Sequence, residues 1–463
     1  MVSWKRKAAG EHSFRISTDC LPLVRLLFLA FAVTLLAPLS IAQTFSAGGL
    51  GSSVTPFPAA AELTGMAYAG VALPSDGASS FLLNPARLAS VEPGVSASLL
   101  GRQLKYEFTD FYANAYSLTA GIAPEASSLR FGVGLGRSTL DLGEQVTTDA
   151  QGNEGETFDF VPAALVFGGA VQYDGPVSVA LGVAARRVSE PNVLRFFSLD
   201  PEDEVGDLIG WGVDLGLQAH VPLVRASDGG FSASVGLGYA IQNWGGTQSL
   251  TSSESALSLD YPMATLARLG WSASFGYDVE RLGRDVRAAH VDVALEASHV
   301  LTREEYERTV ITPDGEVQGA FPTYRTAAPL GRIRALDALL GRGREPGARA
   351  FGNDLIDTRA AAVVGHRALR VVLYEALTLR AGTYTDPVFF DPDEESTYYS
   401  LGLGLSAAGL FRFLDPLSSL AALGERGDVR LSYAYYDYHE ETQLNPDPTQ
   451  PWSLGLTLVA RWP

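Results

Sequence analysis

The sequence predicts an all-β protein: a transmembrane antiparallel β-barrel of about 14 strands with an N-terminal hatch inside its lumen. From residue 94 onward, large apolar side chains alternate with small ones, as in Leu129, Phe131 and Val133 against Gly132 and Gly134. A period of two predicts strands. The second face carries mostly Gly, Ser and Thr, whereas an exposed face of a soluble sandwich carries larger polar residues. The apolar face is therefore predicted to meet lipid, where a sheet must close because no backbone group can remain unpaired.

The alternation recurs in segments separated by turn-forming or charged residues, and an even number of strands places both ends of the barrel on the periplasmic side. Connections that follow odd-numbered strands are predicted to be the long outer loops, with 302–357 the longest. Connections after even-numbered strands are mostly tight; the exceptions are 279–287 and 408–427, where residues 410–423 are predicted to form a short amphipathic segment at the inner interface. The predicted strands are 94–105, 110–122, 128–138, 158–173, 176–189, 208–222, 231–243, 264–278, 288–301, 358–374, 376–385, 397–407, 428–438 and 452–462.

The last strand gives a check on length. Trp452 and Trp462 lie ten residues apart on the same face. At about 3.3 Å per residue and a tilt of about 40°, this separation corresponds to roughly 25 Å of height, the thickness of the apolar band of such barrels. The two indoles are therefore expected at the two membrane interfaces.

Residues 1–42 are predicted to be a secretory signal peptide, with basic residues before an apolar run at 26–36 and small residues near Ala42. Cys20, the only cysteine, precedes that run, so the mature chain is expected to contain no disulfide. The formal net charge of −18 argues against a nucleic-acid partner. Export and a barrel together indicate the outer membrane of a Gram-negative-type bacterium.

Residues 43–93 are predicted to form the hatch, with the barrel following at 94–463. Small residues recur at positions 65, 67, 69, 70 and 72, and turn formers follow at 74–77. An apolar stretch, Phe81-Leu82-Leu83, then precedes Asn84-Pro85-Ala86. Because asparagine before proline is disfavoured in the α region, a sharp turn is expected there. The preferred interpretation of Asn84-Pro85-Ala86 is a turn that pins the hatch to the wall, and the alternative is a gate on a ligand path.

Several of these residues resemble the hatch of the outer-membrane long-chain fatty-acid transporter (FadL-like) superfamily and its PorV/PorQ-type branch. Gly65-Met66, Ala69-Gly70-Val71-Ala72, Asp76 and Asn84-Pro85-Ala86 match, while Ala67-Tyr68 replaces the usual Gly-Gly. Shorter matches lie at 236–245, 268–270 and 379–382. The resemblance implies a monomeric barrel in which rearrangement of the hatch opens a passage for hydrophobic molecules, lined by Phe81, Leu82 and Leu83.

By alternation alone, eight charged side chains face the lumen. Isolated charges in a narrow lumen are costly, so we expect a salt-bridged network that holds the wall to the hatch; a selectivity filter is the alternative. His220 and His290 also face inward, and lone histidines of this kind are expected to be hydrogen-bonded rather than metal-bound. The predicted lumen charges are Arg130, Arg186, Asp214, Arg268, Asp292, Glu296, Arg380 and Arg430.

Two functional hypotheses follow, and neither is enzymatic, because no G-x-S-x-G or H-E-x-x-H motif is present. No cofactor or metal is expected. The first hypothesis is hatch-gated transport of hydrophobic, fatty-acid-like small molecules across the outer membrane. The alternative is a PorV-type accessory of a type IX protein secretion system, which would hold secreted proteins through outer loops such as 302–357. Outer-membrane lipid is a partner in both.

Overall fold

The computed structural model describes most of the barrel and, apart from residue 76, the predicted hatch from residue 60 onward. The predicted signal peptide, residues 43–59 and most of the loop 302–357 lie outside the described residues. All described residues belong to one compact unit. They are 60–75, 77–106, 109–124, 127–141, 143–148, 154–191, 206–224, 230–252, 258–263, 265–281, 284–300, 302–306, 310–311, 317–318, 322–326, 363–387, 395–414, 424–438 and 452–462.

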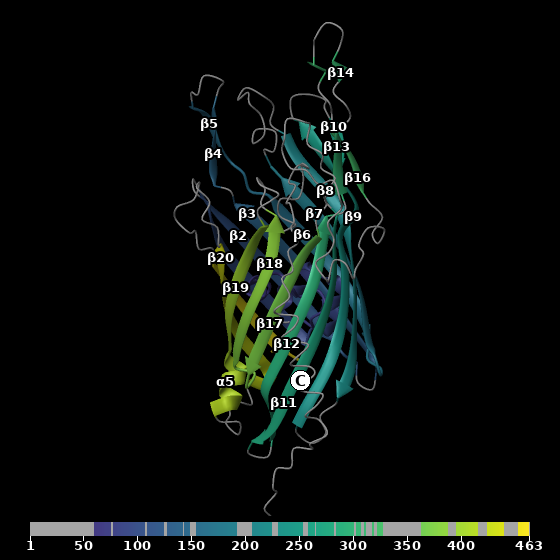
Figure 1. Ribbon diagram of the computed structural model, residues 1–463, viewed down its shortest axis with the longest axis vertical. Coiled ribbons are helices and arrows are strands. Elements are labelled where there is room, and N and C mark those ends of the chain that lie inside the picture. Colours follow the sequence, from purple (N-terminus) through teal and green to yellow (C-terminus); the bar gives the residue numbers. More distant parts are fainter. Residues whose placement is uncertain are drawn as a thin grey trace, which may run out of the picture. The chain divides into compact units, whose positions relative to one another are not determined.

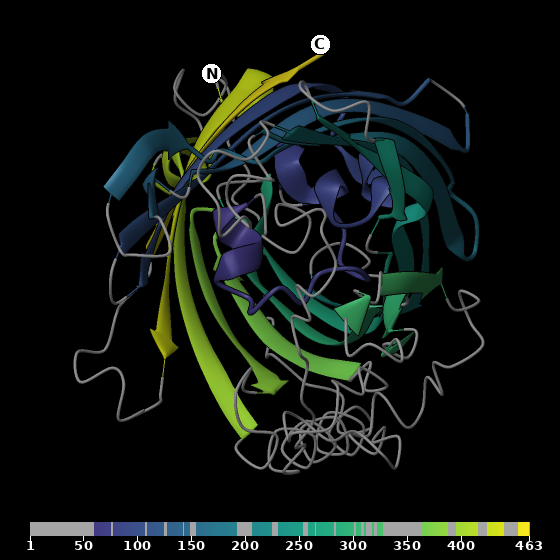
Figure 2. The ribbon, with the colours of Figure 1, turned by 90° about the horizontal axis from the view of Figure 1, so that it is seen from above.

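Fourteen antiparallel strands form a closed ring, so the predicted fold class and strand number are confirmed (Figures 1 and 2). The ring closes where β21 pairs with β1, from Gly94 opposite Arg461 to Gln103 opposite Trp452. In chain order the strands are β1 (Gly94–Tyr106), β2 (Thr109–Ile122), β3 (Leu129–Asp141), β6 (Ala163–Tyr173), β7 (Ser178–Glu190), β8 (Gly206–Val224), β9 (Gly230–Ser252), β11 (Leu266–Arg281), β12 (Arg284–Val300), β17 (Val363–Leu373), β18 (Leu377–Pro387), β19 (Glu395–Ser406), β20 (Gly427–Tyr438) and β21 (Trp452–Arg461).

The remaining elements outside the hatch lie in the connections between barrel strands. Most follow odd-numbered strands of the ring and gather at its outer end (Figure 1), whereas α5 follows an even-numbered strand and lies at the inner end. The elements are β4 (Glu144–Thr148), β5 (Glu154–Asp159), β10 (Ser258–Pro262), β13 (Thr302–Tyr306), β14 (Val310–Ile311), β15 (Val317–Gln318), β16 (Pro322–Thr326) and α5 (Ala407–Leu414).

Several predicted boundaries are wrong, and two of them change a connection. The predicted strand 158–173 is divided, because β5 ends at Asp159 and β6 begins at Ala163, after Pro162, which has no N–H for the ladder. The connection 279–287 is a tight hairpin instead of a loop, since β11 continues to Arg281 and β12 begins at Arg284. Asp278 and Arg287 stand opposite each other and form an ion pair across the hairpin.

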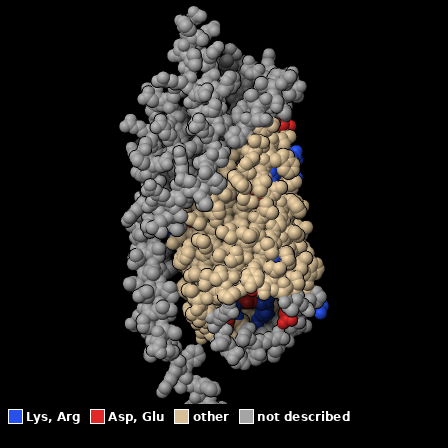
Figure 3. Space-filling view, turned by 90° about the vertical axis from the view of Figure 1, so that its right-hand side faces the viewer, with Lys and Arg blue, Asp and Glu red and all other residues tan. Residues whose placement is uncertain are grey.

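The outer surface of the wall is apolar over a broad band. In β3, Phe131, Val133 and Leu135 are exposed, while Gly132 and Gly134 between them are buried on the lumen side. Figure 3 shows one such face, largely free of charged side chains, which lie mainly at its lower edge and its upper right. No helix among the described residues is long and apolar enough to cross a membrane. An apolar exterior on a sheet without free edges identifies a transmembrane β-barrel.

The hatch fills the lumen with three short turns of helix, α2 (Ala61–Thr64), η1 (Ala78–Leu82) and η2 (Pro85–Ser90), seen inside the ring in Figure 2. Nearly all of its side chains are buried. Unlike the wall, it makes few backbone hydrogen bonds of its own, and these close local turns. Its position therefore depends on how the wall side chains hold it.

Candidate functional site: the hatch and the inner vestibule

The wall reaches the hatch through glycines. At these positions the hatch backbone lies so close that even a methyl group would overlap with it, which explains why the lumen face of the strands is built from such small residues. For five wall glycines, a Cβ atom added to the glycine would lie 2.0–2.5 Å from the nearest hatch atom. The distances are 2.0 Å at Gly132 (to the Leu88 oxygen), 2.3 Å at Gly182 (to the Pro85 carbonyl carbon), 2.1 Å at Gly216 (to Asn84 Oδ1), 2.2 Å at Gly238 (to the Val71 oxygen) and 2.5 Å at Gly382 (to the Met66 carbonyl carbon).

Replacing one of these glycines should displace the hatch and leave the barrel intact. In Gly216→Ala, the new methyl would overlap with Asn84, and relieving such overpacking costs about 1–3 kcal/mol. We expect faster cleavage of the hatch by added protease, with unchanged heat-dependent gel mobility of the barrel. Gly365→Ala is the matched control, because a methyl there meets no atom within 4 Å. Equal cleavage of both variants would contradict the close fit.

Side chains of the wall also bond to the hatch backbone. Glu296 accepts hydrogen bonds from the Gly70 and Val71 amides at 2.8 and 2.9 Å. Gln218 donates through Nε2 to the oxygens of Val71 and Leu73, at 2.9 and 2.8 Å. Together with the contacts below, these bonds tie the hatch to strands on several sides of the ring.

A histidine holds the other side of the hatch. His366 Nδ1 lies 2.8 Å from the Ala67 oxygen and its Nε2 lies 2.8 Å from Ser298 Oγ. Because a carbonyl only accepts, Nδ1 carries the proton and Nε2 accepts from the serine hydroxyl. Ala67 and Tyr68 both have positive φ, 48° and 66°, a conformation that is strained for residues other than glycine.

The structure places Asn84, Pro85 and Ala86 at a turn in the centre of the hatch. Asn84 Oδ1 accepts from the Ala86 amide at 3.0 Å and caps η2, with Pro85 in its first turn. Asn84 Nδ2 donates to the Val71 oxygen at 2.9 Å and to the Leu217 oxygen of the wall at 3.3 Å. This geometry fits the pinning interpretation, because one side chain joins two parts of the hatch to β8.

Phe81, Leu82 and Leu83 lie buried at the end of η1. The Leu82 oxygen accepts from Arg186 Nη2 at 3.2 Å and from Gln242 Nε2 at 2.6 Å. Two wall strands, β7 and β9, therefore hold the same hatch carbonyl.

The Arg186 contact belongs to an irregular part of the wall. Between the pairs Trp211–Thr247 and Leu215–Ile241, the β8–β9 register shifts, so β9 contains more residues than β8. Asp214 Oδ1 accepts the Asn243 amide of this bulge at 2.8 Å, and Asp214 Oδ2 pairs with Arg186 at 2.6 Å. This carboxylate therefore connects the bulge to the side chain that holds Leu82.

The predicted lumen charges do not form a single network. At hatch level, Arg268 pairs with Glu296 at 2.7 Å, in addition to the Arg186–Asp214 pair, and all four side chains are buried. Asp292 is also buried, and it pairs with Arg370 at 2.7 Å and His290 at 3.0 Å. The sequence prediction missed Arg370 and His366, although both face inward in β17 by the same alternation, as His366, Ala368 and Arg370 against Leu369 and Val371.

Arg130 does not belong to the enclosed network. Its side chain is 44% exposed and pairs with Asp174, in the turn between β6 and β7, at 2.6 Å. Alternation assigned the correct side of the strand, but Arg130 is the second residue of β3 and lies at its open end. His220 does face the lumen and is half-buried.

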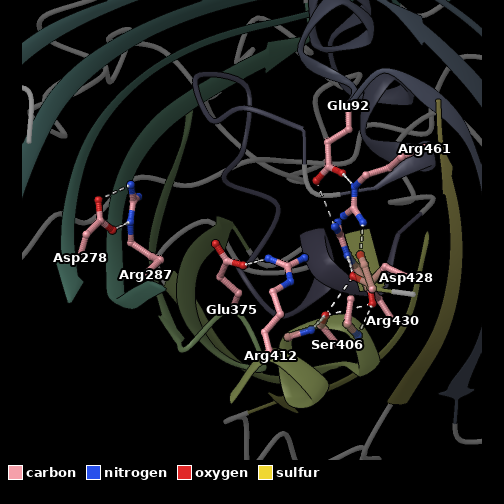
Figure 4. A network of polar contacts seen from close by, with 12 residues as sticks. Glu92, Asp278, Arg287, Glu375, Ser406, Arg412, Asp428, Arg430 and Arg461 are labelled. Carbon is pink, nitrogen blue, oxygen red and sulfur yellow. Dashed lines mark hydrogen bonds and ion pairs between the residues drawn. The ribbon is translucent and has the colours of Figure 1, made fainter. Parts of the chain in front are cut away.

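A vestibule of about 660 Å³ opens beneath the hatch at the inner end of the barrel. Arg430 pairs there with Asp428 at 2.7 Å and with Glu92 at 3.2 Å, while Arg461 also pairs with Glu92 (Figure 4). The buried Arg380 contributes to the same lining. Five acidic and five basic residues line the vestibule: Glu62, Glu92, Glu375, Glu425 and Asp428, with Arg370, Arg380, Arg412, Arg430 and Arg461.

Glu92, at the junction of hatch and barrel, makes this rim sensitive to acid. Partial burial opposes ionisation, but the hydrogen bonds and charges of Arg461 and Arg430 outweigh it and lower the pKa of Glu92 below its ordinary value. A lowered pKa gives a stabilisation that is present above the unfolded-state value, about 4.3, and is lost as the pH falls through the folded-state value. We expect Glu92→Gln to lower the thermal midpoint at pH 7 and to match the wild type once Glu92 is protonated. A difference that persists in acid would contradict this linkage.

Beside the hatch tip, the lumen faces of β2, β6 and β7 form an apolar column, although two charged side chains, Arg102 of β1 opposite Ala113 and Glu190 at the end of β7, are also buried in this outer part. Inward side chains of β2, β6 and β7 pack on Phe81 and Leu82, and a second cluster, to which Leu140 of β3 and Met263 also contribute, follows farther out. Ala113 and Ala164, for example, precede Ala115 and Val166 toward the outer end. The first cluster is Ala61, Phe81, Leu82, Leu88, Leu100, Ala115, Val166 and Ala184, and the second is Ala113, Leu140, Ala164, Val188 and Met263.

No protein-family model and no curated protein sequence matches the chain. Among solved structures, it is similar to the CymD monoaromatic hydrocarbon channel, with 14% identity over 90% of this chain and 99% of that chain, at a TM-score of 0.39. It is also similar to the P. putida toluene transporter TodX, with 13% identity over 87% and 98%, at 0.38, and to a Pseudomonas aeruginosa FadL homologue, with 12% over 86% and 97%, at 0.39. The fold assignment rests on the chain's own strand pairing.

Proposed function

We propose that this protein is an outer-membrane transporter in which the hatch gates the entry of hydrophobic small molecules, of the fatty-acid-like kind, into the lumen. The observation that carries the proposal is the apolar column on β2, β6 and β7, which ends on Phe81 and Leu82. A hydrophobic solute favours such a surface over the water of the outer lumen. The resemblance of the hatch sequence to the FadL-like superfamily supports the same function, and the molecule would act as a monomer.

Passage requires the hatch to move, since its backbone touches the wall glycines around the ring. The bonds that hold it are side-chain hydrogen bonds, each contributing about 0.5–1.5 kcal/mol, or more where a charge takes part. A ligand that binds the displaced hatch better than the closed one would shift this equilibrium. Phe81, Leu82 and Leu83 line the proposed route, and Asn84, Pro85 and Ala86 form the turn about which it opens.

The test measures entry of a hydrophobic naphthylamine dye, which brightens in lipid, into cells whose outer leaflet is lipopolysaccharide. Cells that express the protein should take up the dye faster than cells with the empty vector. Deletion of residues 60–92, with the barrel shown to be folded by its heat-dependent gel mobility, should change the rate. Unchanged uptake on deletion would contradict a hatch gate.

A second candidate function is a PorV-type docking barrel of a protein secretion system. The bonded hatch favours it, because such a barrel does not need an open lumen. Secreted proteins would then bind at outer loops, of which the connection 302–357 is the longest. Co-purification of a secreted protein, lost when that loop is shortened while dye uptake is unaffected, would favour docking over transport.

A further inference from the structure

An exposed apolar face remains on α5, at the inner rim directly below β19 (Figure 1). Leu410 and Leu414 are 46% and 64% exposed. Residues four apart lie on the same face of a helix, so the two leucines form one surface. None of the described parts of the chain covers this surface, because both side chains keep their exposure within the whole described unit.

The opposite face of α5 is fixed to the barrel. Gly409 packs on the turn between β17 and β18, where an added Cβ would lie 2.1 Å from the Glu375 oxygen. Phe413 packs against Tyr374 with the ring planes tilted and 4.7 Å between ring centroids. Arg412 pairs with Glu375 (Figure 4). These contacts determine which side of the helix faces away from the barrel.

The first turn of α5 is also held. The Gly409 amide donates to Ser406 Oγ at 3.0 Å, and the Ala408 amide donates to Asp428 Oδ1 at 2.9 Å. A carboxylate at a helix N-terminus favours the helix through its dipole. The orientation of Leu410 and Leu414 is therefore built into the fold.

We infer that α5 is an interfacial helix that inserts Leu410 and Leu414 into the inner leaflet of the membrane, among phospholipid acyl chains. The apolar face of α5 continues the lipid-facing surface of the wall. Leu401, Leu403 and Leu405, all exposed on the outside of β19, run to the residue before the helix cap. A helix with one apolar and one charged, anchored face is suited to the boundary between headgroups and acyl chains.

The inference is independent of transport and can be tested by the depth of a spin label. In a Cys20→Ser background, a nitroxide is attached to Leu414→Cys in vesicles of phosphatidylethanolamine and phosphatidylglycerol. Molecular oxygen concentrates in lipid, whereas a polar, water-soluble nickel chelate remains in water. We expect the label at 414 to collide more with oxygen than with nickel, as at Leu403→Cys in the lipid-facing wall.

The reference for water is Glu425→Cys, on the exposed rim of the vestibule. A label at 414 that is as accessible to nickel as the label at 425 would overturn the inference. The inference would also be overturned if the label at 414 were shielded from nickel only after a soluble protein is added, because the surface would then bind a protein partner. Leu410→Cys provides the same measurement if the variant at 414 does not fold.

Discussion

Hydrophobic dye uptake should stop when a disulfide joins residues 79 and 117 under oxidising conditions. It should resume when that disulfide is reduced. Ser79 Oγ in η1 and Ser117 Oγ in β2 lie 2.7 Å apart and are buried. Cysteines at both positions would bring two sulfurs close to bonding distance, about 2.05 Å, with little movement of the backbone. Because Cys20 is the only native cysteine and lies in the predicted signal peptide, no other thiol competes.

The matched control joins two wall strands. Ser98 Oγ and Thr457 Oγ1 are also 2.7 Å apart, on the paired strands β1 and β21. Ser98→Cys with Thr457→Cys adds a disulfide of similar geometry and leaves the hatch free. We expect uptake to fall to the level of the empty vector only for the oxidised 79–117 variant. Uptake that continues with this bond formed would mean that hydrophobic molecules do not pass by movement of η1.

The strands could be predicted from the sequence because burial here follows a period of two. Gly132 and Gly134 face the hatch and Phe131 and Val133 face lipid, as the alternation requires. The same rule fails where the period is interrupted. Asn243 and Gly245 have φ of 58° and 64° in the β9 bulge, so the alternation ends there and the predicted strand ended with it. The structure continues β9 to Ser252.

The candidate site was predictable only in part. Alternation indicates which side of a strand a charge occupies, and it placed Arg186, Asp214, Arg268 and Glu296 in the lumen, where they are buried. Alternation contains no information about height along the barrel, which is why Arg130, at the end of β3, was predicted to belong to the enclosed lumen network. Partners are harder still, since they depend on strand register and on the path of the hatch. That Glu296 receives two hatch amides, for example, follows from packing between segments 225 and 226 residues apart.

Asp214→Asn should be the most destabilising single change at the site. Asp214 and Arg186 are 1% and 3% exposed, so the neutral side chain would leave a buried guanidinium without its counter-charge. Breaking a buried pair on one side costs about 3–5 kcal/mol. The amide oxygen of asparagine can still accept the Asn243 N–H, so the substitution tests mainly the charge. The measurement is the free energy of unfolding by urea in detergent micelles.

Two further variants show whether the lower free energy of unfolding of Asp214→Asn comes from the unpaired buried charge. Asp174→Asn makes the same chemical change in the exposed Arg130 pair, where about 0–1 kcal/mol is expected. Arg186→Met combined with Asp214→Asn removes both charges and should recover most of the stability, because no buried charge remains. The double variant should still loosen the hatch, since the Leu82 oxygen would keep only Gln242 as a donor. If Asp214→Asn and Asp174→Asn lower the free energy of unfolding by the same amount, the Arg186–Asp214 pair does not hold the hatch.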